Sequence, residues 1–266
     1  MQRLRVVAVE GDDEMSRLAN TLNAMIGRLE TSFGGLRRFT ADASHELKTP
    51  LTVLRADVER SMSAPPNSTE QMIALEEALQ ETARMTSLVD SLLTLARADE
   101  GRFDLFREPV VLKEIAQEVY ETGLILGEPA ELTVIMNDAE DITLQGDRTR
   151  LRQLFMNLVE NAIKYTPKGG TVTLSLTTVD GMVQFAVQDT GIGIAAADLP
   201  HIFERFWRAD RARSRMGERS GNGLGLAICQ WIAQAHGGQL TVHSRLHRGS
   251  TFTVVIPIDN SARGAA

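Results

Sequence analysis

The chain of 266 residues contains two groups of polar residues that together could transfer a phosphoryl group. In the first group, His45 is followed directly by Glu46. Most imidazole side chains are neutral near pH 7, so one ring nitrogen has a lone pair that can attack phosphorus. Glu46 can accept the proton of the other ring nitrogen and is the candidate general base. Thr49, one helical turn further on, could orient a water molecule in the reverse, hydrolytic reaction.

Pro50 follows this group and cannot donate a backbone hydrogen bond to the carbonyl of Glu46. We therefore expect the helix that contains His45 to bend within a turn of the nucleophile. An isolated histidine is more often an ordinary surface residue, so the functional interpretation of His45 depends on its neighbours.

The second group lies on a helix predicted over Thr149–Tyr165, with Asp147 as a candidate N-cap. One face of this helix is polar at spacings of three and four residues. Its amide and carboxylate oxygens suit Mg²⁺, and its lysine suits a phosphate. Tyr165, at the helix end, could lie along an adenine ring or pack in the core. The candidate metal ligands are Asn157, Glu160 and Asn161, and the candidate nucleotide ligands are Asn157, Asn161, Lys164 and Tyr165.

Two glycine-rich loops follow this helix. The first comes directly after an alternating strand, and its aspartate could accept a hydrogen bond from an adenine amino group, although the same pattern also occurs in simple turns. The second opens an amphipathic helix, whose free N–H groups can hold phosphate oxygens. The candidate ligands are Asp189, Gly191 and Gly193 in the first loop and Gly221, Gly223, Leu224, Gly225 and Leu226 in the second.

The segment between the two loops is rich in aromatic and then in basic residues. Phe203, Phe206 and Trp207 are interpreted mainly as packing residues. Five arginines between Arg208 and Arg219 predict a mobile, cationic lid over a triphosphate, or a merely solvated loop.

Two long helices are predicted in the first hundred residues. The first runs from Gly11 to about Met62 with a coiled-coil pattern of apolar residues, and the second is capped by Thr69 and ends near Ala96. Such an antiparallel hairpin cannot cover its own apolar face, so we predict a homodimer with a four-helix bundle. The apolar and small residues of the second stripe are Met72, Leu75, Leu79, Thr82, Thr86, Val89, Leu93 and Ala96.

The rest of the chain predicts one mixed sheet with helices layered on one face. Gly101 and residues 103–109 form the expected linker, and a short tail begins at Asp259. Helices are expected near Leu112–Thr122, Thr149–Tyr165 and Leu224–His236, and strands at Leu132–Met136, Ile142–Gln145, Thr171–Thr177, Val183–Gln188, Leu240–His243 and Thr251–Ile256.

Composition narrows the class of protein. The apolar content of 43% is ordinary for a soluble globular chain, and the net charge of −7 argues against nucleic acid as a partner. The single cysteine, Cys229, excludes an internal disulfide and is expected in the core. No apolar run is long enough to span a membrane, so we expect this polypeptide to be soluble and cytoplasmic.

The residues from Phe39 to Thr52 resemble the H-box of sensor histidine kinases of two-component systems, in which the histidine is autophosphorylated. Asn157–Tyr165, Asp189–Gly193, Phe203–Phe206 and Gly221–Leu226 resemble, in order, the N, G1, F and G2 boxes of the kinases' ATP-binding domain. The segment from Gly11 to Met25 resembles the second half of a HAMP linker, although Ser16 replaces the usual glycine. A HAMP linker implies a parent protein that is anchored upstream in the inner membrane.

This resemblance implies an α+β protein, in which a dimeric helical hairpin precedes an α/β sandwich ATP-binding domain of the histidine kinase and gyrase type. The implied boundaries are 1–32 for the partial HAMP linker, 33–100 for the phosphotransfer hairpin, 101–110 for the linker, 111–258 for the ATP-binding domain and 259–266 for the tail.

The implied reaction moves the γ-phosphoryl group of Mg²⁺-ATP to His45 and then to an aspartate on the receiver domain of a response regulator. A phosphatase activity is also implied. The alternatives are a nucleotide-binding scaffold and a clamp ATPase without phosphohistidine chemistry.

Overall fold

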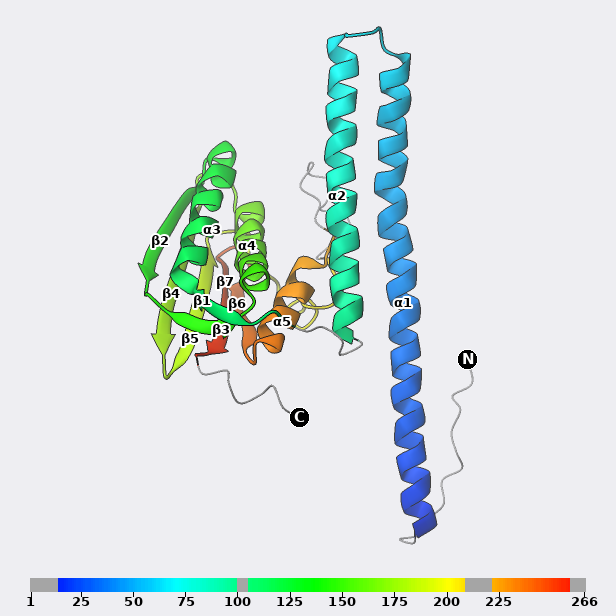
Figure 1. Cartoon of the computed structure of the whole chain (residues 1–266), viewed down its shortest axis with the longest axis vertical. Coiled ribbons are helices and arrows are strands. Elements are labelled where there is room, and N and C mark those ends of the chain that lie inside the picture. Colours follow the sequence, from blue (N-terminus) through cyan, green and yellow to red (C-terminus); the bar gives the residue numbers. More distant parts are fainter. Residues whose placement is uncertain (1–13, 100–104, 209–221, 259–266) are drawn as a thin grey trace. The chain divides into compact units, whose positions relative to one another are not determined.

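The computed structural model describes residues 14–99, 105–208 and 222–258 (Figure 1). The chain divides into two compact units, Met1–Ser87 and Leu88–Ala266, and the second helix crosses the boundary between them. None of the helices in the described ranges is long and apolar enough to cross a membrane.

Helices α1 (Glu14–Ser63) and α2 (Thr69–Asp99) form the predicted hairpin (Figure 1). Pro50 lies inside α1, and the helix continues beyond it to Ser63. Ser68, rather than Thr69, caps α2, because its hydroxyl accepts a hydrogen bond from the backbone N–H of Gln71 at 3.2 Å. Sequence alone could not separate these neighbours, since serine and threonine both favour the cap position.

The apolar stripe predicted on α2 is exposed in a single chain. Ala74 and Ala78 are buried. By contrast, the large apolar members of the stripe have exposed fractions between 40% and 71%. One hairpin therefore leaves much of its apolar surface uncovered. These exposed residues are Met72, Leu75, Leu79, Val89 and Leu93.

The second unit contains a five-stranded sheet with the order β2-β4-β5-β7-β6. Strands β2 and β4 are parallel, and the other neighbours are antiparallel, so the sheet is mixed as expected. Its strands are β2 (Thr133–Ala139), β4 (Thr171–Val179), β5 (Met182–Asp189), β6 (Gln239–Arg245) and β7 (Gly249–Pro257).

A second, two-stranded sheet was not predicted. Strand β1 (Glu108–Val111) pairs antiparallel with β3 (Thr143–Gly146), so β3 does not join the large sheet. The expected linker over residues 101–110 is therefore wrong in its last residues, because Glu108–Val110 belong to a strand. Four residues that include a proline are too few to show an alternating pattern, which explains the error.

Three helices cover one face of the large sheet (Figure 1). They are α3 (Leu112–Gly127), α4 (Arg148–Tyr165) and α5 (Gly225–Ala235), and a short 3₁₀ helix, η1 (Glu128–Ala130), follows α3. The core between the layers includes the stacked rings of Phe155 from α4 and Phe185 from β5, whose centroids are 3.7 Å apart. Alternate residues of β5 point into this core, as the period of two in its sequence predicts.

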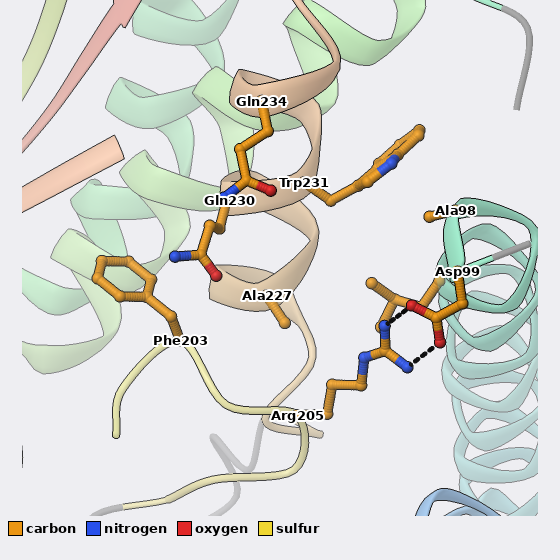
Figure 2. A pocket seen from close by; sticks show the side chains of 9 residues that line it. Ala98, Asp99, Phe203, Arg205, Ala227, Gln230, Trp231 and Gln234 are labelled. Atoms are coloured by element: carbon orange, nitrogen blue, oxygen red, sulfur yellow. Dashed lines mark hydrogen bonds and ion pairs between the residues drawn. The ribbon is translucent and has the colours of Figure 1, made fainter. Parts of the chain in front are cut away.

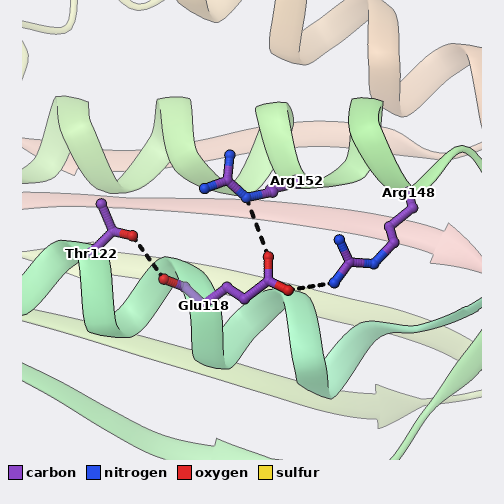
Figure 3. A network of polar contacts seen from close by, with 4 residues as sticks. All are labelled: Glu118, Thr122, Arg148 and Arg152. Carbon is purple, nitrogen blue, oxygen red and sulfur yellow. Dashed lines mark hydrogen bonds and ion pairs between the residues drawn. The ribbon is translucent and has the colours of Figure 1, made fainter.

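A polar network joins α3 to α4 (Figure 3). The carboxylate of Glu118 pairs with the guanidinium groups of Arg148 and Arg152, the latter at 3.3 Å. The hydroxyl of Thr122 donates to the backbone carbonyl of Glu118. These contacts lie at the surface, so they contribute little to the stability of the domain.

Candidate functional site

His45 lies within α1 and is open to solvent. Its side chain is 76% exposed, and its Nδ1 atom is 3.8 Å from Oε1 of Glu46. At that distance the glutamate is beside the ring without a formed hydrogen bond, and a small rotation would bring it within range. The hydroxyl of Thr49 is directed back along the helix toward the carbonyl oxygen of His45, at 3.5 Å. All three predicted residues therefore lie on one segment of helix.

Helix α4 presents the second predicted group. Asn157, Asn161 and Lys164 are half-buried along one side, while leucine and phenylalanine side chains on the other side are fully buried. Glu160 is exposed, yet the protein around its carboxyl group raises its pKa through desolvation. The structure thus retains the amphipathic division that the spacing predicted, with oxygen donors and a cation on the open side.

Tyr165 ends α4 and is not a core residue. Its exposed fraction is 47%, and Nζ of Lys164 lies 5.0 Å from the centre of its ring. Exposure excludes the core role that the sequence left open and keeps the ring available to a flat ligand.

The start of α4 is fixed by a buried polar cluster. Oδ1 of Asp147 accepts the backbone N–H of Arg150 at 3.1 Å, which confirms the predicted N-cap. The backbone N–H of Asp147 donates to Nε2 of His236 at 3.1 Å, and Nδ1 of His236 donates to the carbonyl of Ile232 at 2.8 Å. His236 is fully buried, and its pKa is lowered, first by burial and also by the charge of Arg107. The histidine is therefore neutral and joins α5 to α4.

Asp189 ends β5 and is buried, with an exposed fraction of 5%. Burial raises the pKa of its carboxyl group, and hydrogen bonds from two backbone N–H groups oppose that shift. Both bonds end on Oδ1, from Gly191 at 2.8 Å and from Ser250 at 3.2 Å. Neither bond uses Oδ2, so this oxygen is available to accept a further hydrogen bond.

The first glycine loop is held closely at both ends. The backbone N–H of Ile192 donates to the carbonyl of Tyr165 at 3.1 Å, so the loop is tied to the end of α4. Gly193 has φ of +66°, and a Cβ atom there would lie 2.0 Å from the carbonyl oxygen of Arg245. Only glycine fits that position, because any side chain would collide with the β6–β7 turn.

The second glycine loop is described in part. Gly221 and residues 209–219, which include most of the predicted arginine lid, lie outside the described residues. Gly223 has φ of +69° and its carbonyl accepts the N–H of Phe206 at 2.9 Å. Leu224 is buried, and α5 begins at Gly225 with Leu226 half-buried behind it. The N-terminal end of α5 therefore follows this loop directly, as a phosphate-binding loop requires.

The aromatic segment before the lid packs only partly. Phe203, Phe206 and Trp207 are half-buried rather than core residues. Phe203 and Arg205 line a hollow on the outer side of α5, where the guanidinium group of Arg205 donates two hydrogen bonds to Asp99, at 2.6 and 2.5 Å (Figure 2). This hollow contains none of the predicted nucleotide ligands, so it is distinct from the candidate nucleotide site.

Sequence reasoning missed Ser244, Ser250 and His236. Ser250 is 7% exposed and lies opposite Ser244 in the β6–β7 pair. The sequence offered one signal for these two serines: each is a polar residue at a strand position that the alternation assigns to the buried face. His236 gave a similar signal, because it continues the apolar face of its amphipathic helix, four residues after buried Ile232.

Two family descriptions match successive parts of the chain. Residues 36–101 match the His Kinase A (phospho-acceptor) domain, and residues 146–260 match the histidine kinase-, DNA gyrase B- and HSP90-like ATPase. The first match contains His45, and the second contains α4, both glycine loops and the β6–β7 pair. The two matches therefore coincide with the two groups of polar residues.

Known proteins are similar over most of the chain. The sensor histidine kinase CusS of Escherichia coli is 35% identical over 92% of this chain and 50% of its own length. The structure of full-length ShkA in complex with AMPPNP is 27% identical, with a TM-score of 0.63 over 83% of this chain and 45% of that one. The histidine kinase ThkA, solved in complex with the response regulator protein TrrA, shares the fold at 24% identity and a TM-score of 0.66, over 94% of this chain and 70% of that one.

The chain spans about half the length of the curated relatives it matches. Within that span it has the phospho-acceptor domain followed by the ATPase domain, together with the hairpin and the α/β ATPase fold. The chain belongs to the sensor histidine kinases, of which it has the phospho-acceptor domain and the ATPase domain.

Proposed function

We propose that this chain autophosphorylates His45 from Mg²⁺-ATP and passes the phosphoryl group to an aspartate on a response regulator. The observation that carries the proposal is the presence in one chain of an exposed histidine beside a carboxylate and of a buried carboxylate at the end of β5 with a free acceptor oxygen. The first group supplies a nucleophile and the second a site that selects adenine.

The transfer step balances without a further reactant. A ring nitrogen of His45 forms a bond to the γ-phosphorus of ATP as the bond from that phosphorus to the β–γ bridging oxygen breaks, and ADP leaves. Glu46 accepts a hydrogen bond from the other ring N–H and stabilises the positive charge that develops on the imidazole. The protein has little covalent chemistry to perform, so most of the catalysis comes from placing His45 in line with the breaking bond.

The open face of α4 fits a magnesium ion. Asn157 and Asn161 offer amide oxygens, and Glu160 offers a carboxylate, which are the hard donors that Mg²⁺ accepts directly or through water. A bound Mg²⁺ would neutralise charge on the phosphates. Lys164 on the same face adds a positive charge that suits a phosphate oxygen.

The hairpin is the proposed dimer interface. The large apolar residues of the α2 stripe are at least 40% exposed in one chain, and a second hairpin would cover them in a four-helix bundle. The same hairpin carries His45 and Thr49, so we place the contact with the receiver domain and the phosphatase reaction there. Residues 1–32 are proposed as part of a HAMP linker in a protein anchored in the inner membrane, with this region in the cytoplasm.

The test is phosphorylation with radiolabelled Mg²⁺-ATP. We expect label that is lost in acid and kept in alkali, and that is absent in His45→Gln. His243→Gln is the matched control, because His243 is an exposed histidine on β6. ATP binding without label in the wild-type chain would contradict the kinase proposal and favour a scaffold. ATP turnover that His45→Gln leaves unchanged would favour a clamp ATPase.

A further inference from the structure

Three polar side chains form a row across the end of the large sheet. Asp189 on β5 lies opposite Ser250 on β7, and Ser250 lies opposite Ser244 on β6. In each strand the alternation places these residues on the face that the helices cover, in line with buried Val187 and Phe252. A row of polar groups at the border of an apolar core needs hydrogen-bonding partners within the protein.

Ser244 is the centre of that network. Its Oγ accepts the backbone N–H of Ile194 at 2.8 Å. It also lies 3.0 Å from the carbonyl oxygen of Gly249 and 2.9 Å from Oγ of Ser250. One hydroxyl group therefore contacts the end of the first glycine loop, the start of β7 and the neighbour of Asp189.

The donors and acceptors allow one complete assignment. The carbonyl of Gly249 can only accept, so the hydroxyl hydrogen of Ser244 goes to it. The two lone pairs of Ser244 then accept from the N–H of Ile194 and from the hydroxyl of Ser250. This assignment fixes the hydroxyl of Ser250, whose backbone N–H already donates to Oδ1 of Asp189.

The β6–β7 turn, which begins next to Ser244, packs closely against the backbone of the first glycine loop. A Cβ atom at Gly249 would lie 1.9 Å from the carbonyl oxygen of Asp189, and the N–H of His247 donates to the carbonyl of Ile192 at 2.7 Å. The β6–β7 turn therefore supports the loop from Asp189 to Ile194 along its length. The other contacts in this group are made by the backbone or depend on Gly249. Ser244 contributes through its side chain, so a substitution at this position can test its role.

We propose that Ser244 is a positioning residue for recognition of the nucleotide base. Its hydroxyl holds the loop from Asp189 to Ile194 so that Oδ2 of Asp189 faces the amino group of adenine. Ser244 itself does not contact the nucleotide. The inference rests on the proposed binding of ATP and adds a residue that determines how strongly the site prefers adenine.

The test compares nucleotide binding by the full chain and its variants in isothermal titration calorimetry. Ser244→Ala removes the hydroxyl, whereas Ser244→Thr keeps one. Ser175→Ala is the matched control, because Ser175 is a half-buried serine in the middle of β4 and pairs with Ala186. The probes are Mg²⁺-ATP and Mg²⁺-ITP, in which an oxygen replaces the amino group of the base.

In Ser244→Ala the partly buried N–H of Ile194 loses its partner and the loop can move, so ATP binding should weaken by up to about 5- to 30-fold, the factor that corresponds to one such hydrogen bond. ITP binding should change much less, so the preference for ATP over ITP should fall. Ser244→Thr should retain most of that preference, and Ser175→Ala all of it. An equal loss for both nucleotides, or no loss for either, would overturn the proposal.

Hydrogen exchange gives a second measurement, independent of affinity. In Ser244→Ala, peptides that contain Ile194 should exchange faster, while peptides from β4 should not change. Unchanged exchange at Ile194 would also overturn the proposal. A wild-type chain that binds no ATP would contradict the proposed function itself, whereas normal wild-type binding with an unaffected Ser244→Ala would contradict only the role of Ser244.

Discussion

His236 should make the stability of the second unit depend on pH. The native structure keeps this histidine neutral, because burial lowers its pKa and Nε2 accepts the N–H of Asp147. In the unfolded chain the same side chain takes up a proton near its ordinary pKa of about 6.5. Acid therefore favours the unfolded state. The contribution is fully present above pH 6.5 and is lost as the pH falls below that value.

The size of the effect follows from proton linkage. While only the unfolded chain binds the proton, the free energy of unfolding falls by up to about 1.4 kcal/mol per pH unit. Between pH 7.5 and 5.5 the total loss from His236 is thus at most about 1.4 kcal/mol, because the change begins near pH 6.5. Against a typical stability of about 5–15 kcal/mol, such a loss is measurable.

The assay is urea unfolding of the full chain, followed by tryptophan fluorescence. The chain has two tryptophans, Trp207 and Trp231, and both lie in the second unit, so their signal follows that unit. His236→Gln keeps an acceptor near the position of Nε2 but cannot take up a proton, and His243→Gln serves as the exposed control. The wild type and His243→Gln should lose more stability than His236→Gln between pH 7.5 and 5.5. Equal pH dependence in all three proteins would refute the conclusion that His236 is neutral in the folded chain.

Two further predictions concern α4. Asn161→Ala removes an amide oxygen from the open face of the helix and should abolish measurable binding of Mg²⁺-ATP in calorimetry, while normal affinity would refute its assignment as a ligand. Glu118→Gln weakens the charge pairs of Glu118 with Arg148 and Arg152, which are at least 40% exposed. Its cost in urea unfolding should therefore stay below about 1 kcal/mol and shrink at high salt, and a larger cost that is independent of salt would contradict a surface network.

Patterns with a local period were predictable from the sequence. The polar face of α4 follows from spacings of three and four residues, and the buried face of β5 follows from alternation. Asp147 was recognisable as a cap because it directly precedes the helix. The relevant interactions in these cases join residues that are at most a few positions apart, so each local window contains the necessary information.

Contacts between distant parts of the chain were not predictable. His236 binds the N–H of a residue 89 positions earlier, and no local pattern indicates that partner. The row that contains Asp189 and Ser244 depends on β7 lying between β5 and β6, an order that differs from their order in the chain. Strand β1 exists only through pairing with β3. In each case the fold, rather than the neighbouring residues, determines the contact.

The proposed nucleophile, His45, and the proposed adenine-binding carboxylate, Asp189, differ in how far the folded chain already positions them. Asp189 is desolvated and held by Gly191 and Ser250 in the folded chain, so under the proposed function the selection of adenine should require little rearrangement when ATP binds. His45 is 76% exposed and has no formed hydrogen bond to Glu46, so under the proposed function its orientation should be set only when it meets the phosphate. Recognition of ATP should then be a fixed property of the second unit, and the rate of phosphorylation should depend on how often the histidine reaches it. A signal that acts on the helix containing His45 could therefore change the rate of phosphorylation without changing the affinity for ATP.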